Sequence, residues 1–234
     1  MKSIKSAVLE QNQKITVKES LLSGPLADEC EVKIINAGLC SSDIPRAFDN
    51  GAYFYPLVMG HELSGEIISL GSDINDEFAV GDRVCIFPLL PCFCCSACEQ
   101  KLFALCNDYD YYGSRRNGGF SEILNVKKWN LLKLSIGVSF EDGALIEPTA
   151  VSLHAVKKLN INAQDKSSLC IFGAGFLGLM TVKIVRSLYP NCNITLVDRN
   201  QFKLDIGLKY GAKSEWVGDS SSWGSFLSDK KNSF

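Results

Sequence analysis

Residues 167–178 read SSLCIFGAGFLG, an apolar run that leads directly into a glycine-rich turn. The run predicts a strand, and residues 176–189 have the composition of a helix that follows it. A second strand is expected at 193–198 and a second helix at 201–211, with a third short strand near 215–217. This order of strands and helices predicts the opening half of a doubly wound parallel sheet.

The turn carries the G-x-G-x-x-G spacing of a dinucleotide-binding motif. Its first glycine permits a tight turn, its second lets the backbone approach a pyrophosphate, and its third allows close packing of helix on strand. An aspartate at the end of the second strand favours NAD over NADP, because its carboxylate accepts hydrogen bonds from ribose hydroxyls and repels a 2′-phosphate. The arginine after it softens that preference. A glycine-rich turn without a ligand is the alternative. The expected cofactor-binding residues are Gly173, Gly175, Phe176, Leu177, Gly178, Asp198 and Arg199.

The first part of the chain is expected to be rich in short strands. Residues 15–17, 30–39, 64–71 and 82–87 are rich in β-branched side chains and are separated by turn-forming residues. Many short strands at close spacing predict a partly closed barrel. Residues 140–159 then show helical apolar spacing and are expected to lead out of it.

A cysteine-rich loop, PCFCCSACEQKLFALC, occupies residues 91–106. Cys92, Cys95, Cys98 and Cys106 have the spacing C-x2-C-x2-C-x7-C, which lets four thiolates converge on one tetrahedral zinc. Buried or disulfide-paired cysteines are the alternative, and Cys94 is an additional thiol in the loop. A closed four-thiolate site has no open position, so its expected role is structural.

A second candidate metal set has mixed ligands that are far apart in the sequence: Cys40, His61, Glu62 and Glu147. The chain has only two histidines, His61 and His154, so few residues could serve as a histidine ligand. A lone histidine is nevertheless more often a satisfied polar residue than a ligand. Spacing alone therefore leaves the role of His61 open.

Composition limits the classes of partner. A formal net charge of −2 gives no electrostatic case for nucleic acid or an anionic membrane surface. The first residues lack the long apolar run of a signal peptide, and ten cysteines without such a signal favour a reducing compartment. We therefore expect a soluble cytoplasmic protein that binds neither nucleic acid nor membrane.

The stretches GLCSSD, YPLVMGHELSG, VGDRV, GGFSE, EPTAVSLH and GAGFLG, with the four-cysteine loop, resemble the zinc-containing medium-chain dehydrogenases, most closely their polyol branch. The resemblance runs from residue 30 to about 211. It implies an α/β protein with a β-rich GroES-like zinc domain at 1–158 and the first half of a Rossmann NAD-binding domain at 159–218. Residues 219–234, rich in serine and lysine, are expected to be a loose tail.

The resemblance also implies roles for individual residues. Cys40, His61 and Glu62 bind or face a catalytic zinc, and Glu147 stands where polyol dehydrogenases have a glutamate. Ser42 matches the hydroxyl that relays the proton, so the expected catalytic residues are Ser42 and Glu62. With the four-cysteine site this implies two zinc ions per chain. The implied reaction transfers a hydride from a secondary alcohol of a small-molecule polyol or polyol phosphate to NAD.

Three arginines have no clear role in that reading: Arg46, which is a candidate to meet a substrate phosphate, and Arg115 and Arg116, whose simpler interpretation is a solvated turn. The chain holds one mononucleotide half of a fold that usually needs two. The resemblance implies a homo-oligomer, and we expect the part that mediates oligomerisation to be missing from this chain. The alternatives to a working enzyme are a truncated, inactive fragment that retains zinc and a zinc-binding interaction module.

Overall fold

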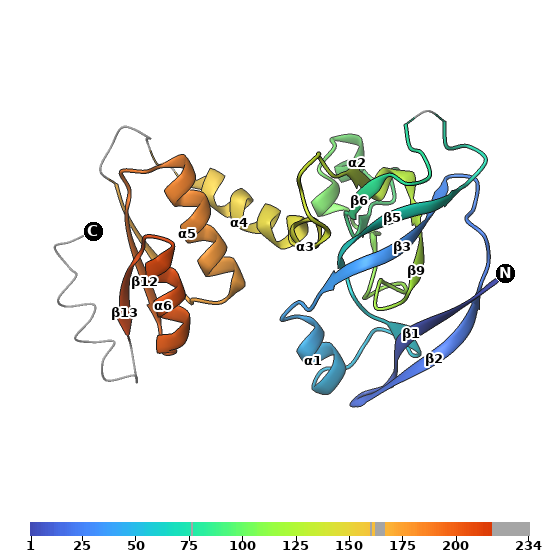
Figure 1. The fold of residues 1–234 in the computed structure, drawn as a ribbon, viewed down its shortest axis with the longest axis horizontal. Helices are drawn as coiled ribbons and strands as arrows, with labels where there is room; N and C mark the ends of the chain where they lie inside the picture. The colour runs from blue at the N-terminus through green and yellow to red at the C-terminus, as the bar shows by residue number, and fades with distance from the viewer. Residues whose placement is uncertain (76, 160, 162–166, 217–234) are drawn as a thin grey trace. The chain divides into compact units, whose positions relative to one another are not determined.

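The computed structural model describes residues 1–75, 77–159, 161 and 167–216, so the expected tail at 219–234 lies outside the described residues. The chain divides into two compact units, Met1–Glu147 and Pro148–Phe234 (Figure 1). The domain boundary predicted after residue 158 falls at the end of helix α4 (Ile146–Lys158), whereas the two units divide between Glu147 and Pro148, near the start of that helix. Within the described part, no helix is long and apolar enough to cross a membrane.

The first unit is built from antiparallel strands arranged in three sheets. A three-stranded sheet has the order β2-β1-β4, a five-stranded sheet the order β10-β6-β5-β3-β9, and β7 pairs with β8. The strands are β1 (Lys2–Gln11), β2 (Lys14–Leu22), β3 (Glu29–Gly38), β4 (Leu57–Val58), β5 (Glu62–Leu70), β6 (Arg83–Ile86), β7 (Leu89–Leu90), β8 (Asp110–Tyr111), β9 (Ile123–Lys127) and β10 (Leu131–Lys133). The four predicted runs of β-branched residues thus lie on β2, β3, β5 and β6.

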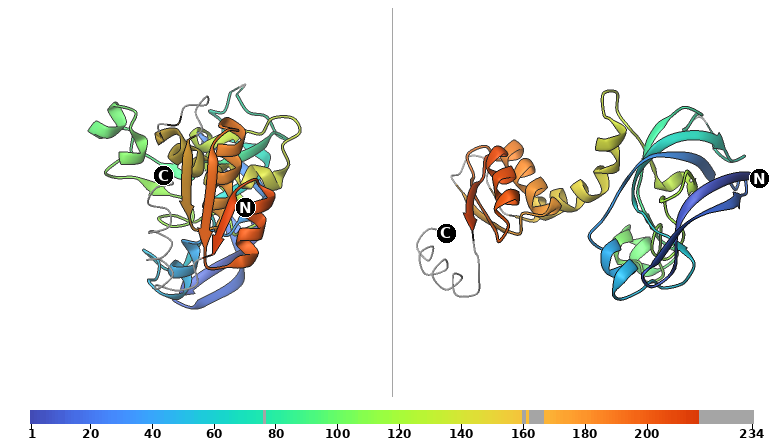
Figure 2. Two further views of the ribbon diagram at one scale, coloured as in Figure 1. Left: turned by 90° about the vertical axis from the view of Figure 1, so that its left-hand side faces the viewer. Right: turned by 60° about the horizontal axis from the view of Figure 1, so that its bottom comes forward.

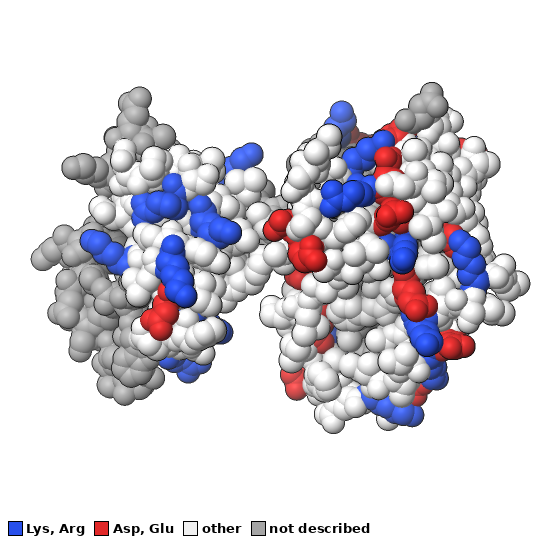
Figure 3. Space-filling view, viewed as in Figure 1, with Lys and Arg blue, Asp and Glu red and all other residues white. Residues whose placement is uncertain are grey.

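The core of the first unit lies against the five-stranded sheet. Val32, Ile67, Val84 and Val126, one from each of four strands, are completely buried. Because successive side chains of a strand point to opposite faces, the strands together present a continuous apolar surface to this core. On the face shown in Figure 3, basic and acidic side chains of this unit lie next to one another rather than gathering by sign.

The segment 140–159, expected to be one helix, forms two: α3 (Phe140–Ala144) and α4. Ser139 caps α3, because its hydroxyl accepts a hydrogen bond from the amide of Asp142 at 3.0 Å. The amide of Leu145 bonds back to Asp142, which closes the first helix before the second begins. Short helices α1 (Asp43–Phe48) and α2 (Ser96–Glu99) and 3-10 turns η1 (Phe103–Leu105) and η2 (Lys128–Asn130) complete this unit.

The second unit has the predicted alternation of strand and helix. Its parallel sheet has the order β11-β12-β13, and helices α5 and α6 lie on the same face of it (Figure 2). The elements are β11 (Ser168–Phe172), α5 (Phe176–Leu188), β12 (Asn193–Asp198), α6 (Gln201–Lys209) and β13 (Lys213–Trp216). Val182, Val185, Leu196 and Leu204 are completely buried between helices and sheet. The fold class predicted for this part is confirmed.

Candidate metal sites and nucleotide-binding turn

The four predicted cysteines of the 91–106 loop converge on one point. The sulfur atoms of Cys92, Cys95, Cys98 and Cys106 all lie within 4.8 Å of one another. The Cys92–Cys98 and Cys95–Cys106 sulfur pairs are each 3.9 Å apart. Sulfurs at about 2.3 Å from a tetrahedral zinc would be roughly 3.8 Å apart, so this donor set fits the metal. Cys94 is outside the group and its side chain is exposed.

Backbone amides in this loop stabilise the ionised form of a cysteine. Hydrogen bonds from the amides of Asn107 and Cys98 lower the pKa of Cys95 to about 6. Burial acts in the opposite direction on Cys98, and with bonds from neighbouring thiols it raises that pKa to about 12. A buried thiol of this kind ionises readily only when a cation compensates it. The pKa values of these thiols are therefore those expected of cysteines that bind a metal ion.

The mixed cluster is assembled by strand pairing. In the antiparallel β3–β5 ladder, Gly38 is the partner of Glu62. Cys40 follows β3 by two residues and His61 precedes β5 by one, so the register brings the three side chains together. Their ligand atoms lie within 4.8 Å of one another. Glycine at position 38 is required sterically, since a Cβ there would lie 2.2 Å from a carboxylate oxygen of Glu62.

Two of the three side chains are buried and Cys40 is half-buried, and the electrostatics of the cluster favour a cation. His61 is 5% and Glu62 7% exposed. Burial raises the pKa of Glu62, although a hydrogen bond with Cys40 opposes the shift. Burial lowers the pKa of His61, which favours the neutral imidazole that binds metals. The Nδ1 atom of His61 is buried without a hydrogen-bond partner. Sulfur, nitrogen and carboxylate oxygen converging on one point form a donor set that fits zinc.

Glu147 lies at the edge of this cluster. It is not among the residues whose ligand atoms fall within 4.8 Å of one another in the described part of the chain. Burial raises its pKa, and the charge of Glu62 raises it further. The hydroxyl of Tyr111 donates to Oε1 of Glu147 at 3.3 Å. Glu147 is therefore a neighbouring carboxylate, held by Tyr111 in the first turn of α4.

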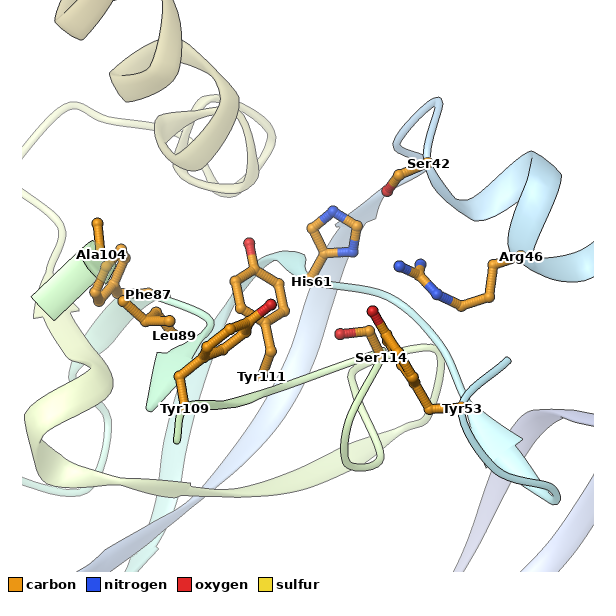
Figure 4. Close-up of a pocket in the computed structure, with 10 residues that line it drawn as sticks. All are labelled: Ser42, Arg46, Tyr53, His61, Phe87, Leu89, Ala104, Tyr109, Tyr111 and Ser114. Carbon is orange, nitrogen blue, oxygen red and sulfur yellow. The ribbon is translucent and has the colours of Figure 1, made fainter. Parts of the chain in front are cut away.

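A cavity of about 480 Å³ opens onto His61 (Figure 4). Its size is in the range of small-molecule sites. Its walls carry the hydroxyl groups of three tyrosines and two serines, together with one guanidinium. The lining residues are Ser42, Arg46, Tyr53, His61, Phe87, Leu89, Ala104, Tyr109, Tyr111 and Ser114. Ser42, the predicted proton relay, thus shares a cavity with the candidate ligand His61.

Several residues of this site were not found from the sequence. Asp43 is 1% exposed, and one of its oxygens lies 3.0 Å from Arg46 and 3.7 Å from Nδ1 of His61. Tyr53, Tyr109 and Tyr111 come from two separate segments. The tyrosines follow no spacing rule, because their common property is the cavity that they line. Asp43 could have been found from its place three residues after Cys40 in a loop that leads into a helix.

The glycine-rich turn has the geometry expected of a dinucleotide-binding motif. Gly173 has φ +97°, a conformation that side chains other than hydrogen disfavour. A Cβ at Gly178 would lie 1.8 Å from the carbonyl oxygen of Gly173, so helix and turn are in direct contact there. A Cβ at Gly175 would meet nothing within 4 Å. The N-terminus of α5 thus adjoins open space, and its unpaired amides could receive a phosphate.

Asp198 is tied to this turn. Its carboxylate accepts hydrogen bonds from the amides of Ala174 at 2.6 Å and Asn200 at 2.8 Å. Burial alone would raise the pKa of Asp198, but these amides outweigh it and hold the pKa below its usual range. The carboxylate is therefore ionised near the turn, as a ribose-binding acid must be. Phe176 and Leu177 begin α5, and Arg199 follows Asp198 on the exposed side.

Residues 26–136 match the family model of the alcohol dehydrogenase GroES-like domain. The chain is 40% identical over 210 residues to galactitol 1-phosphate 5-dehydrogenase of Escherichia coli K12. The matched region covers 89% of this chain and 60% of that protein. It is 30% identical over 216 residues to sorbitol dehydrogenase of Bacillus subtilis, with coverage of 90% and 60%. The chain therefore spans about 60% of the length of these relatives.

Solved structures give the same result. The crystal structure of galactitol-1-phosphate dehydrogenase from E. coli matches with a TM-score of 0.85 and 38% identity, covering 96% of this chain and 65% of that one. An alcohol dehydrogenase from E. coli CFT073, solved in complex with NADH, matches with a TM-score of 0.89 and 26% identity, with coverage of 99% and 67%. The similarity includes both units.

Proposed function

Because this chain belongs to the zinc-containing medium-chain dehydrogenases, we propose that it carries the zinc and NAD sites of a dehydrogenase that oxidises a polyol or polyol phosphate at a secondary alcohol. The observation that carries the proposal is the convergence of half-buried Cys40 with buried His61 and Glu62, next to a cavity lined with hydroxyl groups. The names of the relatives agree with such a substrate.

Cys40, His61 and Glu62 would hold the catalytic zinc, and Glu147 would be the alternative carboxylate ligand to Glu62. When bound, zinc supplies a Lewis acid that lowers the pKa of an alcohol hydroxyl. The four cysteines of the loop would hold a second, structural zinc. The two sites would have different roles. The four-sulfur site has no open position for a substrate, whereas the mixed site adjoins a cavity.

Side chains of the cavity would bind the substrate by hydrogen bonds and transfer its proton. Ser42 is exposed and lines the cavity, so its hydroxyl can accept the proton of the substrate alcohol and pass it to solvent. Tyr111 holds Glu147 by a hydrogen bond and also lines the cavity. The remaining hydroxyl groups suit a polyol, whose alcohol groups both donate and accept hydrogen bonds.

NAD is the proposed hydride acceptor. The turn at 173–178 leaves open space at Gly175 and presents the N-terminus of a thirteen-residue helix to a pyrophosphate. The ionised Asp198 favours the free ribose hydroxyls of NAD over the 2′-phosphate of NADP. NAD thus fits the second unit through its backbone and one carboxylate.

The proposal is tested by following NADH absorbance when the zinc-loaded chain meets NAD and galactitol 1-phosphate, galactitol or sorbitol. We expect turnover of at least one of them, loss of turnover in Cys40→Ser, and retention in Cys94→Ser, whose thiol lies outside both clusters. Turnover that survives Cys40→Ser would contradict the zinc mechanism. A chain that binds zinc and NADH without turnover would instead support the inactive fragment as its function.

A further inference from the structure

One wall of the cavity that opens onto His61 is built around the four-cysteine loop. Half of the ten lining residues fall between residues 87 and 111, within the loop or next to its ends, and form what we call the loop-side wall: Phe87, Leu89, Ala104, Tyr109 and Tyr111. Figure 4 shows these side chains on one side of His61, with Ser42, Arg46 and Tyr53 on the other. The cysteines themselves are not among the lining residues, so the loop shapes the cavity without contributing its sulfurs to it.

The two strands that carry this wall end at the sulfur site. β7 pairs with β8 through Leu89 and Tyr111, which are both lining residues. Cys92 follows β7 by two residues, and Cys106 precedes β8 by four. The amide of Cys92 donates a hydrogen bond to the sulfur of Cys106 at 3.2 Å. The two chain segments that form the wall are therefore joined at the candidate zinc ligands.

Ala104 and Tyr109 lie on either side of one of these ligands. Ala104 is in η1, which ends directly before Cys106, and Tyr109 follows that cysteine by three residues. Between them, the amide of Asn107 donates a hydrogen bond to the sulfur of Cys95. This short segment has one ligand in its middle and a second sulfur bonded to its backbone. Its position is therefore set by the positions of the sulfurs.

The hydrophobic core gives the same segment little support. Within the described residues, Leu90 and Tyr112 belong to the core of the first unit, and no side chain between them belongs to a core cluster. Four rings of this region pack on one another instead, with centres 5.2–5.8 Å apart: Phe87, Phe93, Phe103 and Trp129. Phe93 is 52% and Trp129 38% exposed, so these contacts bury the rings only in part. A segment with so little apolar burial depends on its metal ligands for a fixed position.

We infer that the four-cysteine site positions the loop-side wall and thereby sets the affinity of the cavity for a polyol, without contacting the polyol. Cys92, Cys95, Cys98 and Cys106 are then positioning residues, which fix the distance between this wall and the mixed site at His61. The inference rests on the proposed function, because it takes a polyol as the occupant of the cavity. The order of the wall, in contrast, can be measured without any substrate.

Loss of the sulfur site should raise KM more than it lowers kcat. Tyr109 and Tyr111 would then have to become ordered when the polyol binds, which costs binding free energy. We expect KM to rise about tenfold and kcat to stay within about threefold of the wild type, because the mixed site that carries the chemistry is unchanged. Partial unfolding of the unit has a different signature. It lowers kcat through the number of active molecules and leaves KM unchanged.

Cys98→Ser removes one sulfur from the site, and Cys94→Ser is the matched control, because that thiol lies outside the group. Native mass spectrometry counts zinc per chain, and hydrogen exchange reports the order of residues 103–111. NADH absorbance with galactitol 1-phosphate, galactitol or sorbitol gives KM and kcat. We expect Cys98→Ser to hold one zinc, to lose protection at 103–111 and keep it in β3 and β5, and to show the raised KM. Cys94→Ser should match the wild type in all three measurements.

Cys98→His tests whether metal binding, and not the cysteine itself, is required. An imidazole can complete a zinc site with three sulfurs, so this variant should hold two zinc ions and keep the wild-type KM. A raised KM in a variant that holds both zinc ions would overturn the inference.

Three results with Cys98→Ser would also overturn it: one zinc with a wild-type KM, a fall in kcat at unchanged KM, or wild-type protection at 103–111. If the wild type turns over none of the three polyols, the proposed function fails. Hydrogen exchange at 103–111 then decides by itself whether the sulfur site orders the wall.

Discussion

Asp43 shows how one side chain can organise a site. One of its oxygens accepts the amide of Cys40 at 3.1 Å, and the other lies near Arg46 and Nδ1 of His61. Burial raises the pKa of Asp43, whereas His61, the Cys40 amide and Arg46 oppose the shift. The carboxylate thus fixes the loop that carries one candidate ligand and lies beside the ring of another. Such outer carboxylates set the orientation and basicity of a ligating histidine.

Asp43→Asn should keep the shape of this residue and remove its charge. We expect zinc affinity of the mixed site to fall about 10–100-fold, because His61 loses its charged neighbour. Competition with a chromophoric zinc chelator measures this affinity.

Asp49→Asn is the control, since Asp49 is exposed at the end of the same helix. Its zinc affinity should equal that of the wild type. Equal losses in the two variants would show that Asp43 acts through general charge and not through His61.

The β11–turn–α5 element combines two glycine requirements of different kinds. Gly178 meets protein backbone, whereas Gly175 meets open space. The first therefore concerns packing of helix on turn, and the second concerns what approaches the turn from outside.

The four-cysteine loop is the corresponding element of the first unit, where α2 and η1 are too short to be stable without side-chain or metal contacts.

Gly178→Ala and Gly175→Ala should separate these two requirements. Gly178→Ala places a methyl group against a carbonyl oxygen, so we expect destabilisation of about 1–3 kcal/mol together with loss of NADH binding. Gly175→Ala should leave the unfolding midpoint nearly unchanged and still weaken NADH binding, because its methyl group occupies the ligand's space. Thermal unfolding and NADH fluorescence titration measure the two effects. Unchanged NADH affinity in Gly175→Ala would argue against a pyrophosphate at this turn.

Removal of zinc should affect the cysteine loop more than the barrel. Chelation leaves four converging thiols without a compensating cation, so residues 92–106 should lose protection from amide hydrogen exchange. The buried strands β3 and β5 should keep theirs, because their core does not depend on the loop. Hydrogen-exchange mass spectrometry with and without chelator makes the comparison. Uniform loss of protection over the whole unit would contradict a local structural role.

At the scale of the whole molecule, the chain contains two separate hydrophobic cores. One lies against the five-stranded antiparallel sheet, and the other between the parallel sheet and its helices. Each unit therefore has its own source of stability. The candidate zinc sites lie in the first unit and the nucleotide-binding turn in the second, so the proposed activity needs both units folded.

Leu196→Ala should destabilise the second unit by about 2–5 kcal/mol, because this side chain is completely buried on β12. The matched control is Leu208→Ala on α6, whose side chain is 51% exposed and should cost less than about 0.5 kcal/mol. Chemical denaturation followed by circular dichroism measures both. Similar costs in the two variants would mean that this core does not stabilise the unit.

The sequence by itself determined the features that depend on local spacing. The βαβα order, the glycine turn and the four-cysteine loop each lie within a short segment, and their residues converge through local backbone geometry. The break between α3 and α4 was missed, because a side-chain cap at Ser139 and the closing bond of Leu145 can override apolar periodicity.

Only the tertiary structure decided which distant residues meet. Cys40 and His61 approach each other because Gly38 pairs with Glu62 in the β3–β5 ladder, a register that local patterns do not encode. The same holds for Arg115, which is an ordinary turn residue in the sequence and contacts the rings of Tyr53 and Tyr109, two tyrosines from separate segments. Spacing along the chain specifies contacts within an element, whereas contacts between elements depend on how the sheets pair and pack.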